Sequence, residues 1–284
     1  MTSARRVGDL SMSPVGLGAM PLSVEGHPDA ERSRATIHAA LDAGVTLIDT
    51  ADAYTPDGQL GHNERVVADA LQSRGDTAGV LVATKGGHTR DGGEWGLNGR
   101  PGYLRQACEA SLRALGVDSI GLYQHHRPDP EVPYADTMGG LAALLDAGLV
   151  ERVGISNADR DQIREAQDIL GDGLVSVQNQ LSPKFRSSLP ELELCTELGI
   201  AFLPWSPLGG AREAADLGST HSDFATVADR HGVSPQQVCL AWLLALSPVC
   251  LPIPGSSRPE SIRDSVAAAQ VRLSQDEIAE LSAA

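Results

Sequence analysis

Four side chains with complementary proton chemistry follow three successive apolar runs of the sequence. In chain order they are Asp49, Tyr54, Lys85 and His126. A tyrosine phenol with an ordinary pKa of about 10 exchanges protons poorly at neutral pH. A nearby ammonium group stabilises the phenolate, a carboxylate holds the ammonium group in place, and an imidazole can donate to a carbonyl oxygen. The set therefore suits protonation of a carbonyl oxygen while hydride reaches the carbonyl carbon.

Each of these residues also has an ordinary structural explanation. Asp49 could cap the loop after its strand and Tyr54 could pack there. Lys85 could form a salt bridge with Asp49 at the rim, and the His125-His126 pair could be satisfied core histidines. Each explanation is reasonable alone. Four such coincidences are less so, because parallel strands bring their carboxyl ends together at one rim, where ligands and chemistry gather.

The elements that would position this set are eight short apolar runs alternating with amphipathic segments. The runs expected to form strands are residues 15–17, 45–48, 80–83, 120–123, 150–155, 174–177, 200–203 and 249–253. The segments expected to form helices are 31–43, 64–72, 103–115, 135–147, 160–170, 189–198, 236–246 and 260–269, with a last helix after a Ser274–Glu277 capping box. Alternation of this kind implies parallel pairing through right-handed crossovers.

Eight strand–helix units favour a closed (β/α)8 TIM barrel over an open doubly wound sheet, and such barrels typically need about 250 residues. We therefore predict an α/β protein with a single barrel domain over residues 1–284. Residues 5–13 are expected to form a short hairpin across the barrel floor, and a helix is expected to end the chain. No linker, composition shift or internal sequence repeat divides it.

The charge balance excludes some partners. The chain has 22 Lys and Arg against 37 Asp and Glu, a formal net charge of −15. This argues against binding to nucleic acid or to an anionic membrane surface. The four cysteines lie far apart without metal-ligand spacing, and no signal peptide or run long enough to span a membrane is present. We expect a reduced, cytoplasmic protein.

A set of short motifs in a fixed order carries a resemblance to a known family. The motifs are Asp49-Thr-Ala-Asp-Ala-Tyr54, Thr84-Lys85, Leu122-Tyr-Gln-His-His126-Arg-Pro-Asp, Gly154-Ile-Ser-Asn157, Val177-Gln178-Asn179, Pro204-Trp-Ser-Pro-Leu208-Gly209 and Ile253-Pro-Gly-Ser-Ser-Arg258-Pro-Glu. In order and spacing the chain resembles the aldo-keto reductase family over essentially its whole length. The resemblance implies a barrel that binds NADPH without a Rossmann fold, and no Gly-x-Gly-x-x-Gly fingerprint follows a strand here.

The resemblance also implies roles for the four residues. Tyr54 would be the general acid in carbonyl reduction, Lys85 the partner that lowers its pKa, and Asp49 the residue that holds Lys85. The family has one histidine directly before an aromatic residue or Arg and then Pro, and His126 occupies that place, whereas His125 stands where a leucine is more usual. Because neighbours on a strand point to opposite faces, we expect His126 to point into the rim and His125 towards the helices. With Lys85 and His126 as electrophilic groups, no metal is expected.

The remaining motifs match the family's cofactor contacts. Ser156, Asn157 and Gln178 match residues that hold the nicotinamide carboxamide, and Trp205 matches an aromatic residue stacked on the nicotinamide ring. Further matches to cofactor contacts, from the pyrophosphate to the adenine, are Ser206, Leu208, Gly209, Gly255, Ser256, Ser257, Arg258, Asp264 and Ser265. Asn157 and Trp205 also have structural alternatives. Asn157 could be a helix N-cap, and Trp205 could simply pack in the barrel.

The sequence departs from the family at the adenine end of the cofactor. Gly255, Ser261 and Asp264-Ser265 stand where many NADPH-dependent members have a basic residue, an Arg and a Glu-Asn pair. Arg258 is then the one cation of this motif available to bind a 2′-phosphate. We expect NADPH as the cofactor, with NADH as the alternative.

The expected substrate is a small aldehyde or ketone. The segment 86–101, which contains His88, Trp95 and Arg100, is a candidate wall of the substrate pocket, although glycine-rich polar loops are often simply solvated. The chain ends soon after its last helix, without the tail that covers the substrate in longer relatives, so an open pocket is expected. A competing hypothesis is a cofactor-binding redox-sensing or regulatory module of the same fold with little turnover. The sequence leaves the oligomeric state open.

Overall fold

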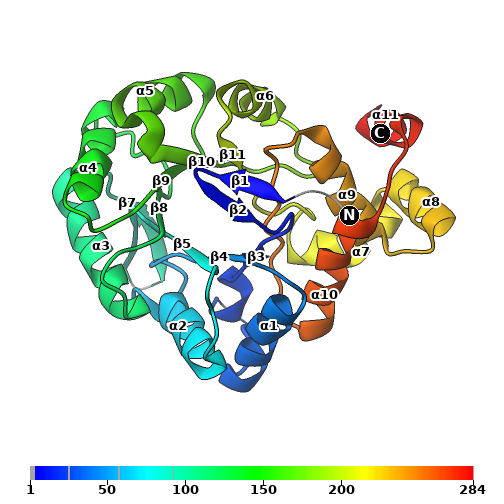
Figure 1. The fold of residues 1–284 in the computed structure, drawn as a ribbon, viewed down its shortest axis with the longest axis horizontal. Coiled ribbons are helices and arrows are strands. Elements are labelled where there is room, and N and C mark those ends of the chain that lie inside the picture. Colours follow the sequence, from blue (N-terminus) through cyan, green and yellow to red (C-terminus); the bar gives the residue numbers. More distant parts are fainter. Residues whose placement is uncertain (1–3, 25, 57, 92, 284) are drawn as a thin grey trace.

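The computed structural model describes residues 4–24, 26–56, 58–91 and 93–283, and its strands curl into the predicted parallel barrel (Figure 1). Seven parallel strands are hydrogen-bonded in a single order, β11-β10-β9-β8-β5-β4-β3. In chain order they are β3 (Leu17–Gly18), β4 (Leu47–Asp49), β5 (Leu81–Gly86), β8 (Leu122–His125), β9 (Val153–Ser156), β10 (Leu174–Gln178) and β11 (Ala201–Phe202). Each overlaps a strand expected from the sequence.

The eighth stave of the barrel is the segment 249–255, which joins the two edges of this sheet without being a regular strand. On one side the Phe202 amide donates to the Val249 carbonyl at 2.9 Å, and on the other the Gly18 amide donates to the Pro254 carbonyl at 3.0 Å. Isolated parallel bridges pair Phe202 with Cys250 and Gly18 with Gly255. Pro252 and Pro254 have no amide hydrogen, so this segment accepts more bonds than it donates and its ladder stays incomplete.

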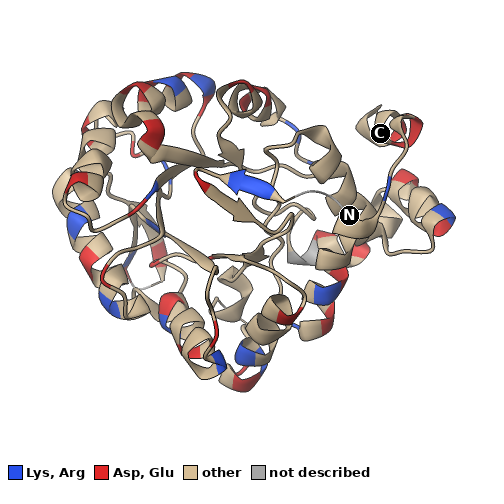
Figure 2. Cartoon of the chain, in the orientation of Figure 1, with Lys and Arg blue, Asp and Glu red and all other residues tan. Residues whose placement is uncertain are grey.

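Helices surround the strands, and charged residues lie mainly on their outer surfaces (Figure 2). The helices that fit the predicted segments to within a few residues are α1 (Ala30–Asp42), α2 (His62–Arg74), α3 (Pro101–Leu115), α4 (Tyr134–Asp146), α5 (Arg160–Leu170), α6 (Leu189–Leu198), α9 (Pro235–Leu246) and α10 (Pro259–Ala267). The terminal helix α11 (Gln275–Ala283) begins with the predicted capping box, in which the Glu277 amide donates to Ser274 and the Ser274 amide donates to Glu277. Within the described residues, no helix is long and apolar enough to cross a membrane.

Two helices and one hairpin were not predicted. The helices α7 (Ala211–Thr220) and α8 (Ser222–His231) lie between β11 and α9. The hairpin is formed by β6 (His88–Asp91) and β7 (Glu94–Leu97), which pair in an antiparallel ladder inside the segment interpreted as a loop. The Asp91-Gly-Gly sequence before Glu94 is a turn signal that could have indicated it.

The amino-terminal hairpin closes the amino end of the barrel, as predicted. Its strands β1 (Arg5–Val7) and β2 (Leu10–Met12) are antiparallel and cross the barrel opening in Figure 1. Val7 and Met12 pack inside the barrel with strand side chains, among them Leu47, Leu81, Leu122, Val175, Ala201 and Leu203. Arg5 is buried and donates to the carbonyls of Cys250 at 3.0 Å and Leu244 at 2.6 Å. The hairpin fills the amino end of the barrel, so the opposite rim is where side chains can meet a ligand.

Candidate active site

Lys85 lies at the centre of the carboxyl-end rim and is completely buried. Its Nζ donates to Asp49 Oδ2 at 2.6 Å, to the Thr50 carbonyl at 2.8 Å and to Tyr54 Oη at 3.4 Å. The register of β4 and β5 pairs Asp49 with Ala83, which places the carboxylate beside the strand that carries Lys85. The structure thus joins the predicted carboxylate, ammonium and phenol in one buried chain of contacts.

The second carboxylate oxygen of Asp49 is held by two amides. Gln178 donates to Asp49 Oδ1 at 2.8 Å and Gln124 donates to the same oxygen at 3.1 Å. A buried carboxylate is stable when its lone pairs are used in this way. Sequence reasoning missed Gln124, although its position two residues before His126 puts both side chains on the inner face of the same strand. Gln178, predicted as a cofactor contact, also supports Asp49.

Burial and two neighbouring charges set the pKa of Tyr54. Burial raises its pKa, the Lys85 ammonium lowers it, and the Asp49 carboxylate raises it again, so that the pKa ends above its ordinary value. Burial alone lowers the pKa of Lys85, but the attraction of Asp49 and Tyr54 outweighs burial and raises it. Lys85 therefore lowers the pKa of Tyr54, the direction expected for its partner, but the net pKa stays above the ordinary value. At neutral pH Tyr54 holds its proton beside a charged ammonium group, as a proton donor should.

His126 lies beside Tyr54. The two rings are perpendicular, with centroids 5.6 Å apart. Burial, followed by the charge of Lys85, lowers the pKa of His126 well below its ordinary value, so the imidazole is neutral at pH 7. A neutral imidazole keeps one N–H with which it can orient a carbonyl oxygen.

His125 occupies the outer face of the same strand, as strand alternation predicts. It is 1 % exposed, and a Cβ atom added to Gly87 would lie 2.9 Å from its Cδ2. Neither ring nitrogen has a hydrogen-bond partner within the described part of the chain, and the nearest aromatic ring is Tyr134, 6.3 Å away between centroids. Burial lowers the pKa of His125 to about 4. His125 therefore lies outside the group of candidate catalytic residues. Its imidazole is buried, and both ring nitrogens lack a hydrogen-bond partner within the described residues.

Replacing His125 with Leu is expected to make stability less sensitive to acid. The unfolded chain binds a proton on this imidazole below pH 6.5, whereas the folded protein does so only near pH 4, so lowering the pH favours unfolding. At about 1.4 kcal/mol per pH unit, wild type should lose about 2 kcal/mol more than His125→Leu between about pH 7 and pH 5. Urea unfolding at both pH values measures this difference, and the exposed His27→Leu serves as control. Parallel losses in wild type and His125→Leu would contradict the prediction.

The residues predicted to hold the nicotinamide carboxamide lie at the ends of β9 and β10. Ser156 Oγ donates to the Gln178 carbonyl at 2.6 Å, and Asn157 Nδ2 donates to the His126 carbonyl at 3.0 Å. Trp205 Nε1 in turn donates to Asn157 Oδ1 at 3.2 Å. These bonds bring three predicted cofactor contacts and Trp205 together next to His126.

Asn157 is not the N-cap of the following helix. That position belongs to Asp159, which forms a reciprocal capping box with Gln162 at the start of α5. Asn157 instead has a left-handed backbone with φ of +58°, and Ser206 has φ of +47°. Residues other than glycine rarely adopt this conformation, and it is concentrated at functional sites. Both residues are predicted cofactor contacts, so the strain coincides with the candidate site.

The loop after β11 contains the residues predicted to approach a pyrophosphate. Ser206 and Gly209 form a tight turn in which the Gly209 amide donates to the Ser206 carbonyl at 2.8 Å, and Leu208 packs against the main core. Gly209 has φ of +86°, and a Cβ there would lie 3.0 Å from Glu213. Backbone amides at such a turn are suited to anionic oxygens.

The segment after the eighth stave is suited to the phosphate end of a dinucleotide. A Cβ on Gly255 would lie 2.9 Å from Pro21, so only glycine allows this close approach. Ser256 is buried and its hydroxyl donates to the Arg258 carbonyl at 3.0 Å, while Ser257 is half-buried. Arg258 precedes α10 and is exposed, with its Nε 3.7 Å from Glu260. An exposed guanidinium beside a helix N-terminus fits an anionic ligand.

The two predicted contacts further along α10 are already engaged in the fold. Asp264 accepts from Ser234 at 2.7 Å and from Gln237 at 2.6 Å, which links α10 to the start of α9. Ser234 also caps the start of α9 by accepting from the Gln237 amide at 3.1 Å, while the Gln237 side chain bonds Asp264. Ser265 is buried. An adenine contact by Asp264 or Ser265 stays a prediction.

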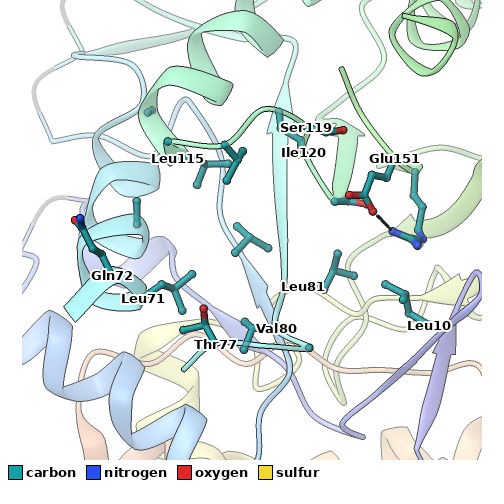
Figure 3. A pocket seen from close by; sticks show the side chains of 18 of the residues that line it. Leu10, Leu71, Gln72, Thr77, Val80, Leu81, Leu115, Ser119, Ile120 and Glu151 are labelled. Carbon is teal, nitrogen blue, oxygen red and sulfur yellow. Dashed lines mark hydrogen bonds and ion pairs between the residues drawn. The ribbon is translucent and has the colours of Figure 1, made fainter. Parts of the chain in front are cut away.

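A large cavity lies at the wrong end of the barrel for this chemistry. It measures about 990 Å³ and lies between β2, α2, α3 and the amino ends of β5 and β8 (Figure 3). Its lining includes Leu10, Leu71, Leu81 and Ile120. Lys85 and Tyr54 lie at the opposite ends of these strands, so the cavity belongs to the barrel floor.

The protein is thus a parallel α/β barrel whose carboxyl-end rim carries a buried Asp–Lys–Tyr chain next to a neutral histidine, a set of groups suited to proton transfer. The model of the aldo/keto reductase family matches residues 14–284. The chain therefore belongs to the aldo/keto reductase family and is an oxidoreductase.

Individual relatives agree with this assignment. An uncharacterized oxidoreductase of Schizosaccharomyces pombe, C215.11c, is 37% identical over 97% of this chain and 88% of its own length. An aldo-keto reductase from Klebsiella pneumoniae, solved with NADPH, is 26% identical with a TM-score of 0.81 over 100% of this chain and 95% of the other. A glycerol dehydrogenase from Gluconobacter oxydans is 25% identical with a TM-score of 0.85 over 99% and 94%.

Proposed function

We propose that this protein reduces aldehydes or ketones to alcohols by direct hydride transfer from NADPH, with Tyr54 as the general acid. One observation carries the proposal: Lys85 Nζ bridges Asp49 Oδ2 at 2.6 Å and Tyr54 Oη at 3.4 Å in a fully buried position. Because this ammonium group is buried, it is not one of the surface charges that keep a protein soluble. It orients and polarises the phenol, which holds its proton at neutral pH and has beside it the cation that can stabilise its anion.

Each residue of the site has a separate role in the proposed reaction. When bound, the nicotinamide cofactor supplies the hydride. Tyr54 donates its proton to the carbonyl oxygen, and Lys85 stabilises the negative charge left on the phenol. Asp49, fixed by Gln124 and Gln178, keeps Lys85 in place. The neutral His126 directs the carbonyl oxygen towards Tyr54. The same groups acting in reverse would oxidise an alcohol.

The proposed cofactor preference rests on Arg258. The Klebsiella pneumoniae relative was solved with NADPH, and Arg258 is an exposed cation at the amino end of α10. Its contact with Glu260 is long and solvated, so it leaves the guanidinium available to a 2′-phosphate. NADH would bind through the same residues without this contact.

Replacing Arg258 with Ala is expected to raise the KM for NADPH by about ten- to one-hundred-fold, the range of a charge-assisted bond to phosphate. The KM for NADH should change by less than about two-fold, because NADH has no 2′-phosphate. Steady-state kinetics with both cofactors measures this, and Arg272→Ala, another arginine near the carboxyl terminus, serves as control. Equal effects on both cofactors would show that the 2′-phosphate is held elsewhere.

The first test of the proposal is cofactor oxidation with 4-nitrobenzaldehyde, an activated and uncharged aldehyde, with NADPH and NADH side by side. Turnover by wild type supports a carbonyl reductase, and the ratio of the two rates reports cofactor preference. Tight NADPH binding without turnover of this or of natural carbonyl compounds would overturn the proposal. It would favour a redox-sensing module of the same fold.

A further inference from the structure

The hairpin of β6 and β7 turns one face towards the candidate active site. Its register pairs Arg90 with Trp95, so these two side chains share a face with His88. The ring of His88 lies perpendicular to that of His126, with centroids 4.3 Å apart. Arg90 Nη2 reaches the Thr55 carbonyl, directly after Tyr54, at 3.5 Å. The hairpin therefore forms a wall beside both proton-handling residues.

Arg90 is held in place but not neutralised. Its guanidinium lies over the Trp95 indole, 4.1 Å from the ring centroid. Its Nε is buried without a hydrogen-bond partner in the described part of the chain, and no ion pair there includes Arg90. Other arginines of this acidic protein do have carboxylate partners, for example Arg74 with Asp42 at 2.6 Å and Arg152 with Asp9 at 2.7 Å. A buried donor without an acceptor lowers stability, so hydrogen bonding within the described fold does not explain the position of Arg90.

A second cation lies near His126, next to it in the chain. Arg127 follows His126, is exposed and takes part in no ion pair within the described residues. It lines a recess of about 330 Å³ with Asn157, Trp205, Phe185, Asp159 and Glu191. Burial lowers the pKa of His88 and its hydrogen bond to Gly96 raises it, while the charges of Arg127 and Arg90 add to the lowering. Both arginines therefore act on the same region of the rim, although the protein as a whole has a net charge of −15.

The shape of the Arg90 site selects among anions. The Trp95 indole covers one flat face of the guanidinium, so a ligand would approach the edge formed by Nη1 and Nη2, where Nη2 has only the long 3.5 Å contact with the Thr55 carbonyl. A planar carboxylate matches that edge with two parallel N–H···O bonds. Arg127 adds a second positive charge near this rim, next to the carboxylates of Asp159 and Glu191 in its own recess.

We infer that Arg90 binds the carboxylate of the substrate, so that the preferred substrates are aldehydes that also carry a carboxylate group. The inference rests on the proposed carbonyl reduction and deepens it. The aldehyde would lie at Tyr54 and His126 while the carboxylate meets the Arg90 fork. The side chains of the hairpin thereby determine specificity, and the proton chemistry remains with the residues of the barrel strands.

The test compares carboxylates with their uncharged methyl esters. The panel is glyoxylate, succinic semialdehyde and 4-carboxybenzaldehyde, which differ in the distance between aldehyde and carboxylate, each paired with its ester. For at least one pair, wild-type kcat/KM should favour the acid by about ten-fold or more, as expected for a charge-assisted bidentate contact. Arg90→Gln should remove that preference and leave ester turnover within about two-fold of wild type. Arg90→Lys should restore part of it, and Arg34→Gln on α1, with the same change in charge, should retain it.

Several outcomes would overturn the inference. Equal turnover of acids and esters by wild type would do so, as would an equal loss of both in Arg90→Gln, which would show that Arg90 only supports the hairpin. If wild type turns over neither acids nor esters, the proposed function fails, and binding decides on the anion site. Protein fluorescence should then be quenched by benzoate more than by benzamide in wild type and equally in Arg90→Gln. The same response to both in wild type would reject the anion site.

Discussion

Replacing Tyr54 with Phe is expected to lower kcat/KM for carbonyl reduction by about a thousand-fold, within the range of about 10² to 10⁴ for general acid catalysis. The variant keeps the ring and loses the hydroxyl, which is the proton donor beside Lys85. Affinity for NADPH, measured by fluorescence titration, should stay nearly unchanged, because the other candidate cofactor contacts remain.

The matched control for Tyr54→Phe is Tyr134→Phe. Tyr134 is a partly buried tyrosine on α4 whose hydroxyl has no hydrogen-bond partner in the described chain. Its ring lies 6.3 Å from that of His125 on the outer face of β8, not beside Lys85, so its loss should leave kcat/KM unchanged. If Tyr54→Phe kept wild-type activity, another residue would have to supply the proton and the assignment of Tyr54 would be wrong.

Replacing Lys85 with Met is expected to have the largest effect on stability. The side chain keeps its length but loses the charge, and the carboxylate of Asp49 is left buried without a cation. Removing one partner of a buried ion pair typically costs about 3–5 kcal/mol. Activity should fall by about 10² to 10⁴, because Tyr54 loses the group that stabilises its anion. Urea unfolding and steady-state kinetics measure the two effects.

A second substitution separates structure from chemistry in this pair. The double variant Lys85→Met with Asp49→Asn holds no buried charge at either position, so it should recover most of the lost stability. Its activity should stay as low as that of Lys85→Met, since the ammonium group is still missing. A double variant as unstable as the single one would show that the Asp49–Lys85 ion pair is not the source of the stability loss.

Local patterns were sufficient to predict most of the barrel. The α5 and α6 bounds, the amino-terminal hairpin and seven strands were predictable, because hydrophobic periodicity and capping residues depend on neighbours in the chain. The eighth strand was predicted but is irregular, since Pro252 and Pro254 cannot donate to a ladder. The helices α7 and α8 were missed, as was the hairpin of β6 and β7 in a segment that reads as a polar loop.

The sequence by itself determined which residue types stand at the strand ends, and strand alternation assigned His126 and His125 to opposite faces of one strand. Only the tertiary structure decided how these groups act on one another. The hydrogen bonds to Asp49 Oδ1 come from Gln124 and Gln178, which are 75 and 129 positions away in the chain. The net pKa of Tyr54 depends on burial competing with Lys85, and the place of Arg90 beside the candidate site depends on a hairpin folding back on Thr55. Burial, distance and unpaired donors arise from long-range packing, which no local pattern in the sequence encodes.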